Sequence, residues 1–430
     1  MSTIFALGSG TPPAGVALIR LSGPAAGPTL KALTNRPLPA PRHTSLRRLH
    51  DPRTGTLLDT ALTLWFPAPA SFTGEDCVEL HLHGSPAVVA GVLDALSAMP
   101  GLHPAEAGEF TRRAFLNGRI DLTQAEALSD LIVAETAAQR DQALTNASGR
   151  LRAKAESWRH HLLTLLADAE ADLDFAEEEA DVAAGLATVR HRVAPLLAEL
   201  DSALASADSG ARVRDGLTIA VIGPPNAGKS SLVNALAARD VAIVTPHAGT
   251  TRDIIEVPLN LGGVPAIVLD TAGLRDSTDP VEAEGIARAR ARAASADLIL
   301  LLGEESIDVP GSVLKIRNKI DLSEERPGDH GSHVALSATT GAGLDSLLDR
   351  LIAWARAQMP PGEPALVTHA RHVHWLSTAR EDLRAAQRQP DPVLRAESLR
   401  LAVRALGRLT GAVDAEAVLD QIFSRFCIGK

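Results

Sequence analysis

The sequence predicts an α/β plus all-α protein in which a helical domain is interrupted by an inserted α/β domain. Three observations lead to this fold class. Residues 1–118 alternate short β-type runs with glycine and proline turns, and residues 119–210 have apolar residues at helical spacing. Strands and helices then alternate over residues 211–356, and the helical pattern returns over residues 357–430. A length of 430 residues also exceeds one ordinary core.

The composition is that of a soluble globular protein. Hydrophobic residues make up 45% of the chain, yet no uncharged stretch reaches the roughly 20 apolar residues that a membrane span requires. The amino terminus has no basic segment and no long apolar run, so it is not a signal peptide. The net charge of −10 argues against a uniformly basic surface but allows a local basic patch for nucleic acid. Cys77 and Cys427 are far apart, which is consistent with a reducing cytoplasm.

In the first domain, β-type runs are separated by turn segments such as T-P-P-A-G and L-S-G-P. Residues enriched in strands gather in these runs. We therefore expect strands over residues 16–21, 57–66 and 77–81.

The helical region begins near Thr123, which forms a candidate capping box with Glu126. Residues 123–173 contain no proline, and their leucines recur at helical spacing. The acidic run from Asp168 to Glu179 is typical of a solvated helix face. A second helical stretch extends to about residue 209.

The inserted domain carries a phosphate-binding loop. A strand expected over residues 218–222 leads directly into G-P-P-N-A-G-K-S at residues 223–230, and a helix follows. The glycines let backbone N–H groups surround phosphate oxygens, and the helix N-terminus adds its positive end. Lys229 would reach the β- and γ-phosphates, and the Ser230 hydroxyl is a hard ligand for Mg²⁺. The nucleotide contacts expected here are Asn226, Ala227, Gly228, Lys229, Ser230 and Ser231.

Two further segments are suited to the phosphates. D-T-A-G follows an apolar strand expected over residues 266–269, and the Asp270 carboxylate can hold Mg²⁺ through water. G-T-T-R-D, at residues 249–253, is a candidate switch segment in which Thr251 would complete the Mg²⁺ shell. The contacts expected from both segments are Gly249, Thr250, Thr251, Asp270, Thr271, Ala272 and Gly273.

Two further segments would select the base of the bound nucleotide: N-K-I-D at residues 318–321 and S-A-T-T-G at residues 337–341. The Asp321 carboxylate can accept hydrogen bonds from both N1–H and the exocyclic amine of guanine, a donor pair that adenine lacks. Motifs of these kinds in this order predict a Ras-like P-loop G domain that binds GTP and GDP. The expected base contacts are Asn318, Lys319, Asp321, Ser337, Ala338 and Thr339.

Hydrolysis needs a group that orients water. Leu274 follows Gly273, where many GTPases have a glutamine for this purpose. Four acids lie just beyond it, and the residues alone do not choose between them. They are Asp276, Asp279, Glu282 and Glu284.

Segments outside the nucleotide motifs make the chain resemble the MnmE (TrmE) family of bacterial tRNA-modification GTPases along nearly its whole length. They are W-F-P-A-P-A-S-F-T-G-E-D at residues 65–76, G-E-F-T-R-R-A-F-L-N-G-R-I-D-L-T-Q-A-E-A at residues 108–127, and the terminal F-C-I-G-K. GTPases at large do not share these segments. The resemblance implies that residues 1–118 form an aminomethyltransferase-like domain for folate binding and dimerisation.

The resemblance also implies a reaction. With a MnmG-like flavoprotein, these homodimeric proteins add a (carboxymethyl)aminomethyl group to C5 of the wobble uridine, U34, of certain tRNAs. The carbon derives from a formyl-tetrahydrofolate. The resemblance places 5-formyl-tetrahydrofolate, or a related folate, against Arg20, Glu79, Arg119 and Lys430. A basic residue suits the glutamate tail of folate, and a carboxylate suits the donor edge of the pterin.

Proteins of this family use K⁺ beside the β- and γ-phosphates, where other GTPases use an arginine finger. By resemblance, K⁺ would be held by the side chain of Asn226 and by the segment containing Thr245, His247 and Thr250. Thr245 would also contact the nucleotide. The resemblance further selects Glu282 as the catalytic group that positions water, alongside Lys229 on the phosphates.

Two segments depart from the family pattern. The loop at residues 11–17 is short for the folate domain, and residues 297–318 are short for a G domain. Cys427 has no histidine or carboxylate beside it in sequence, so we expect a structural rather than a catalytic role.

Two other functions stay open on the residues alone. One is an RNA-binding or ribosome-assembly switch of the Era or Der kind. Era-like proteins carry a G-x-x-G loop after the G domain and Der-like proteins carry two G domains, and this chain shows neither feature. The other is a folate enzyme with a G domain that acts alone.

Overall fold

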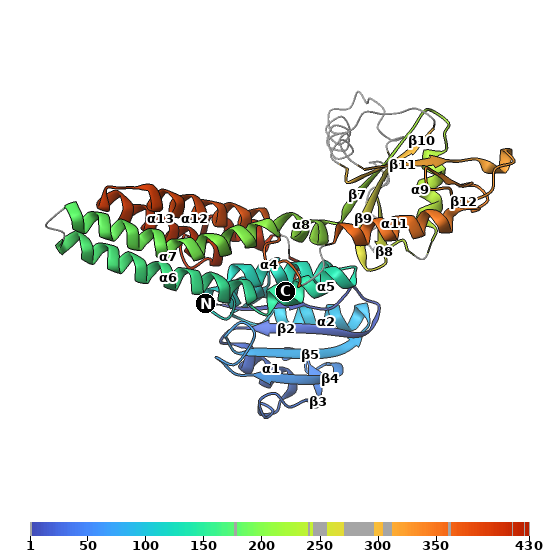
Figure 1. Ribbon diagram of the computed structural model, residues 1–430. Coiled ribbons are helices and arrows are strands. Elements are labelled where there is room, and N and C mark those ends of the chain that lie inside the picture. Colours follow the sequence, from blue (N-terminus) through green and yellow to red (C-terminus); the bar gives the residue numbers. More distant parts are fainter. Residues whose placement is uncertain are drawn as a thin grey trace, which may run out of the picture. The chain divides into compact units, whose positions relative to one another are not determined.

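The computed structural model describes residues 2–175, 179–239, 241–243, 256–270, 296–303, 312–359, 363–414, 416–424 and 426–429 (Figure 1). The chain forms two compact units. The first consists of residues 1–129 with 406–430, and the second of residues 130–405. Across the described ranges, no helix has the length and apolar character needed to cross a membrane.

The first unit is built on a six-stranded sheet in the order β3-β4-β5-β2-β1-β6. All neighbouring strands are antiparallel except β1 and β6. The three predicted strands lie within β2, β4 and β5. The bounds are β1 Thr3–Leu7, β2 Ala14–Ser22, β3 Ser45–His50, β4 Leu57–Phe66, β5 Cys77–Gly84 and β6 Leu102–Pro104.

The faces of this sheet differ because side chains alternate along each strand. Ile19 and Leu80 belong to a buried cluster with α1 (Ala26–Thr34) and α2 (Pro86–Ser97). Arg20, the next residue along β2, is directly opposite Glu79 of β5 and lies on the other face. One face therefore forms the core, and the other carries a charged pair.

The end of the chain returns to the first unit. Phe423 of α14 (Glu416–Phe423) and Phe426 pack against Leu122, which begins α4 (Leu122–Val133). Gly429 lies so close to β1 that a Cβ atom on it would be 2.2 Å from the Leu7 carbonyl oxygen. The carboxyl-terminal segment thus packs against the first strand.

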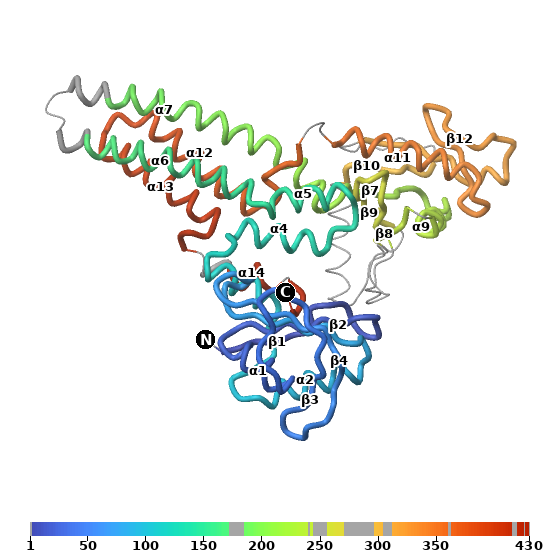
Figure 2. The backbone as a smooth tube through the Cα atoms, turned by 90° about the horizontal axis from the view of Figure 1, so that it is seen from below, coloured from blue at the N-terminus to red at the C-terminus, as the bar shows by residue number. Residues whose placement is uncertain are grey.

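The second unit begins with helices. The helices α6, α7, α12 and α13 lie side by side, as both views show (Figures 1 and 2). Trp158 and Leu162 of α6 are buried, as their helical spacing predicted. The bounds are α5 Ala137–Ala147, α6 Arg150–Phe175, α7 Glu179–Ala205, α8 Ala207–Asp215, α12 Ala370–Arg388 and α13 Pro392–Thr410.

The predicted capping box at Thr123 is wrong. Asp121 caps α4 instead, because its Oδ1 accepts a hydrogen bond of 2.8 Å from the Gln124 backbone N–H. Gln124 Oε1 accepts in return from the Asp121 backbone N–H at 3.2 Å, and a capping box also joins Thr136 and Gln139 at the start of α5. A turn at Gly149, with φ of 86°, then separates α5 from α6. The region expected as a single helical stretch is therefore several helices.

The inserted domain has a seven-stranded sheet in the order β12-β13-β11-β10-β7-β9-β8. Its central strands are parallel, and both faces are covered. Accordingly β10 reads L-I-L-L-L, and each of these residues is buried. The bounds are β7 Leu217–Ile222, β8 Glu256–Leu261, β9 Val264–Asp270, β10 Leu298–Leu302, β11 Ser312–Arg317, β12 Gly328–Asp329 and β13 Val334–Ala335, with α9 Lys229–Ala237 and α11 Leu344–Gln358.

Candidate functional site

The phosphate-binding loop lies at the carboxyl end of β7, whose neighbours on both sides, β9 and β10, run parallel to it. Such a position is typical of ligand sites in parallel sheets. Asn226 and Gly228 have φ of 63° and 92°. A Cβ atom on Gly228 would lie 2.3 Å from the Asn318 side-chain nitrogen. A Cβ atom at this position would collide with the Asn318 amide, which explains why the motif has glycine here.

Lys229 begins α9 and points back to the loop. Its Nζ donates hydrogen bonds of 2.9 and 3.0 Å to the carbonyls of Gly223 and Pro224. Ser230 and Ser231 follow in the first helical turn. Asp270, which ends β9 and is 3% exposed, is aligned with Val221 of β7. The ammonium group, the Ser230 hydroxyl and the Asp270 carboxylate therefore come from the same edge of the sheet.

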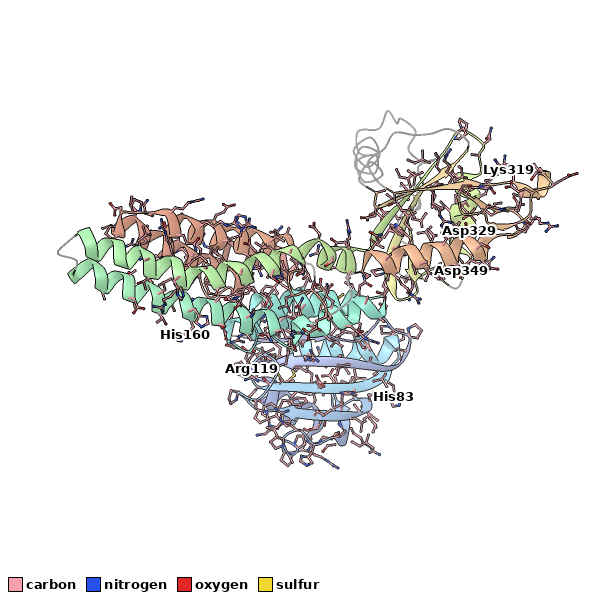
Figure 3. The ribbon with its side chains drawn as sticks, viewed as in Figure 1. His83, Arg119, His160, Lys319, Asp329 and Asp349 are labelled. Atoms are coloured by element: carbon pink, nitrogen blue, oxygen red, sulfur yellow. The ribbon has the colours of Figure 1, made fainter. Side chains whose placement is uncertain are left out.

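Asn318 joins the base motif to the phosphate loop. Its side-chain nitrogen donates to the Ala227 carbonyl at 3.0 Å. Its side-chain oxygen accepts from the backbone N–H groups of Lys319, at 2.8 Å, and Ala338, at 3.0 Å. Lys319, labelled in Figure 3, donates from Nζ to the Asn226 carbonyl at 2.7 Å. Direct hydrogen bonds thus hold together the phosphate loop, the N-K-I-D segment and the S-A-T-T-G segment.

The other residues expected to contact the guanine base lie in the same two segments. Asp321 is exposed in a short 3-10 turn, Ile320–Leu322. Ser337 is buried and its hydroxyl accepts from the Thr340 N–H at 3.2 Å, while Thr339 is exposed. A cavity of about 630 Å³ opens beside these motifs. Its lining comprises Ala227, Leu302, Gly303, Lys315, Ile316, Arg317, Asn318, Lys319, Ser332 and His333.

Several expected contacts lie outside the described residues. They include the whole switch segment, the end of D-T-A-G, the candidate K⁺ ligands other than Asn226, the catalytic acid and the last folate contact. These residues are Thr245, His247, Gly249, Thr250, Thr251, Thr271, Ala272, Gly273, Glu282 and Lys430. Their roles stay predictions.

A second pocket, of about 250 Å³, lies in the first unit and brings together Arg20, Glu79 and Arg119. Arg20 and Glu79 form an ion pair of 2.9 Å between Nη2 and Oε1, and both side chains are largely covered. The lining is completed by Arg42, Phe66, Ala70, Ser71, Phe72 and Cys77.

The two family motifs of the first unit meet beneath this pocket. Arg113 pairs with Glu75 at 3.1 Å, and the Asn117 side-chain nitrogen donates to the Thr73 carbonyl at 2.7 Å. Gly74 has a φ of 79°, and a Cβ atom added to it would lie 3.1 Å from the Asn117 side chain and 3.3 Å from the Arg119 side chain. The contacts fix the loop that ends at Arg119, which Figure 3 labels.

Sequence reasoning did not assign the other six lining residues to this pocket, and Arg42, Phe66 and Phe72 have the largest side chains among them. The Arg42 guanidinium carbon lies 5.6 Å from the ring centroid of Phe66, and Phe72 lies on the same wall. Phe66 and Phe72 belong to the motif at residues 65–76, so their signal was present. Arg42 belongs to no motif, and no sequence signal identified it. Of the cysteines, Cys77 is buried in the pocket wall and Cys427 is exposed.

A phosphate loop tied to a guanine-selective motif on a largely parallel sheet defines a P-loop GTPase. The parts of the chain outside the G domain define it further. Residues 3–119 match the family described as GTP-binding protein TrmE N-terminus, and residues 122–427 match the MnmE helical domain. The chain belongs to the MnmE (TrmE) family of tRNA modification GTPases.

Relatives align with the chain over its full length. The tRNA modification GTPase MnmE of Methylorubrum populi is 51% identical over 440 residues, which cover 100% of this chain and 98% of the relative. The protein of the same name from a Bradyrhizobium species is 50% identical, with coverage of 100% and 99%. The mitochondrial 5-taurinomethyluridine tRNA synthase subunit GTPB3 of Homo sapiens is 48% identical, with coverage of 100% and 93%.

Proposed function

We propose that this chain hydrolyses GTP during modification of the wobble uridine, U34, in certain tRNAs. With a MnmG-like flavoprotein it would add a (carboxymethyl)aminomethyl group to C5, using a carbon derived from formyl-tetrahydrofolate. One observation carries the proposal: Asn318 ties the guanine motif to the phosphate loop in a chain that aligns with MnmE proteins from end to end. The Era-like or Der-like switch has no comparable support.

On the nucleotide, Lys229 binds the β- and γ-phosphates and Asp321 selects guanine. Ser230 and Thr251 would hold Mg²⁺, with Asp270 acting through water. The Ser230 hydroxyl, a hard oxygen at the first turn of α9, fits this ion. Bound there, Mg²⁺ would neutralise charge that develops on the phosphates.

Hydrolysis would depend on K⁺ and on Glu282. Asn226, exposed in the loop, offers a neutral side-chain oxygen, and Thr245, His247 and Thr250 complete the proposed ligand set. GTP turnover should be fast in KCl and slow in NaCl at matched ionic strength. Asn226→Ala should remove the difference between the salts, whereas Glu282→Ala should slow turnover in both. Equal rates in the two salts for the unmodified chain would defeat the K⁺ proposal.

The pocket of the first unit would bind 5-formyl-tetrahydrofolate or a related folate. Glu79 would accept hydrogen bonds from a pterin, while Arg20 and Arg119, which line the same pocket, would supply positive charge for the glutamate tail. The pocket is smaller than the roughly 300–1,000 Å³ of most small-molecule sites, so it suits one ring system with the tail outside. Gly429 packs on β1 of the same unit, which favours a contribution from Lys430.

The first unit would also form the homodimer. Leu46 of the edge strand β3 and Leu62 of β4 are directly opposed, and they are 65% and 43% exposed. Paired exposed leucines at a sheet edge are a typical docking surface for a second chain. We expect the dimer to act in the cytoplasm, on tRNA.

The proposed modification is tested by mass spectrometry of wobble uridines in tRNA from cells that lack this chain. The C5 aminomethyl-type group should disappear from U34. Its persistence at the normal level would contradict the proposal.

A further inference from the structure

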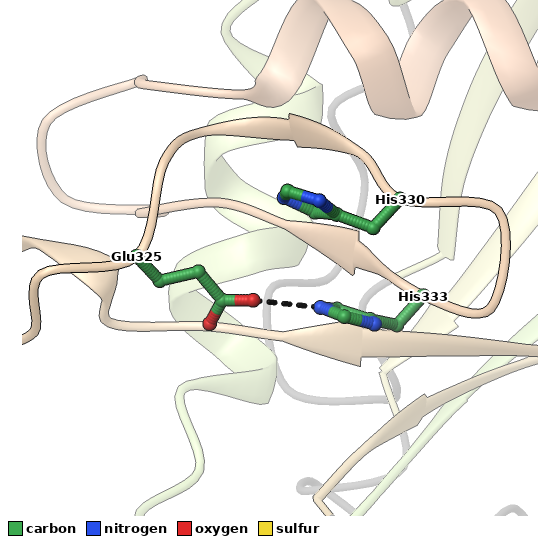
Figure 4. A group of neighbouring side chains, drawn as sticks. All are labelled: Glu325, His330 and His333. Atoms are coloured by element: carbon green, nitrogen blue, oxygen red, sulfur yellow. Dashed lines mark hydrogen bonds and ion pairs between the residues drawn. The ribbon is translucent and has the colours of Figure 1, made fainter.

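A cluster of metal-ligating side chains lies on the hairpin between β11 and α11, apart from the GTP contacts proposed above. Glu325, His330 and His333 each offer a ligand atom, and these atoms all lie within 4.8 Å of one another (Figure 4). None of the three is among the expected GTP contacts, although His333 also lines the cavity beside the guanine motifs.

The hairpin itself brings the histidines together. Asp329 of β12 is opposite Val334 of β13, so the next facing pair is His330 and His333. The His330 backbone N–H donates to the His333 carbonyl at 3.0 Å, and Gly331 has the positive φ, 79°, that this tight turn needs. The two rings stack with centroids 5.1 Å apart.

Glu325 is held beside this pair. Its Oε1 lies 2.7 Å from the His333 Nε2, and its Oε2 accepts from Arg317 at 3.2 Å. Glu325 and His333 are partly covered and His330 is exposed, so an ion can enter from solvent.

Each histidine has a neighbouring group that can accept the proton of its second ring nitrogen when an ion binds the first. The Glu325 carboxylate accepts a hydrogen bond from His333 Nε2 at 2.7 Å, and an ion would displace this proton. Ser332 Oγ, 3.1 Å from His333 Nδ1, can then accept a hydrogen bond from a proton on Nδ1. His330 Nε2 lies 3.0 Å from the Arg326 carbonyl, so a proton there leaves the Nδ1 lone pair available. Metal-binding histidines commonly donate their second N–H in this way.

We propose that Glu325, His330 and His333 form a binding site for a divalent transition-metal ion of the zinc class. Two imidazole nitrogens and one carboxylate oxygen are a ligand set that suits Zn²⁺, whereas Mg²⁺ and Ca²⁺ prefer oxygen alone. The ligand atoms of tetrahedral zinc lie roughly 3.3 Å apart, given bonds of about 2.0–2.1 Å. Rotation of the side chains, above all the exposed His330, can close the cluster to that spacing. One coordination position would be left for water.

The test measures zinc bound by the full chain, with GDP and excess Mg²⁺ present so that the hard-cation site is filled. Competition with a chromophoric chelator should show one more equivalent bound to the unmodified chain than to His330→Asn or His333→Asn. Glu325→Gln, which preserves size, should weaken binding at least about tenfold. Retained GDP binding shows that each variant is folded.

Two controls separate this site from other ligands. His160 and His161 are also exposed neighbours, with ring centroids 6.4 Å apart, and His160→Asn should leave the stoichiometry unchanged. Cys427→Ser reports any zinc held by the exposed thiol. The proposal is overturned if the unmodified chain binds no zinc, or if the hairpin variants bind as much as the unmodified chain.

Discussion

Replacing Asn318 with alanine should weaken the binding of guanine nucleotides, largely because Asn318 holds the guanine motif and the phosphate loop together. Asn318→Ala removes one hydrogen bond to Ala227 and one each from Lys319 and Ala338. Each such bond contributes about 0.5–1.5 kcal/mol, and water replaces part of that at a half-buried site. A net loss of about 2–3 kcal/mol corresponds to about 30- to 150-fold weaker binding.

The effect should fall on GTP and GDP alike, because Asn318 positions both loops whichever nucleotide is bound. Titration of a fluorescent guanine nucleotide measures it. Asn117→Ala is a matched control, since it removes a single side-chain hydrogen bond to Thr73 in the first unit. This substitution should leave the affinity for nucleotides unchanged and should weaken the binding of folate instead. Nucleotide affinity within about threefold of normal for Asn318→Ala would refute the positioning role.

Three further predictions address base choice, folate and the helices. Asp321→Asn should weaken GTP and favour xanthosine triphosphate, and unchanged GTP affinity in a titration would remove Asp321 from the base site. Deleting residues 426–430 should weaken the binding of formyl-tetrahydrofolate, measured by calorimetry, while GTP binding persists. Normal folate affinity would exclude these residues from the folate site. Lys154 and then Trp158 lower the pKa of Glu199 below its usual 4.5, so this stabilisation is present at neutral pH and is lost as pH falls. Glu199→Gln should therefore cost roughly 0.5–1 kcal/mol of unfolding free energy at pH 7, allowing for solvent screening, and less as the pH falls below the usual value for a glutamate; an equal cost at neutral and acidic pH would count against the pair.

The sequence was informative where chemistry and local pattern coincide. Strand, glycine loop and helix are contiguous around Lys229, so the phosphate loop could be placed directly. The folate residues came only from family resemblance. The residues around Arg20 and around Glu79 in the sequence do not indicate a binding site, because the pairing of the two side chains depends on the register of β2 against β5.

Other features depend on contacts between distant residues. The hydrogen bond from Asn318 to Ala227 joins positions 91 apart, and Arg42 lines the pocket of the first unit although it belongs to no motif. The start of α4 was misplaced because Thr123 has a suitable side chain but Asp121, two residues earlier, makes the cap. Competing caps of similar chemistry are decided by backbone geometry that a sequence pattern does not contain.

The most direct test is complementation of cells that lack this chain, with mass spectrometry of U34 in their tRNA. The unmodified chain should restore the C5 aminomethyl-type group. Lys229→Ala, which loses the ammonium group at the phosphate loop, should not restore it, even though the protein accumulates normally. Restoration by the Lys229→Ala chain to the level of the unmodified chain would contradict the claim that GTP hydrolysis at this loop serves tRNA modification.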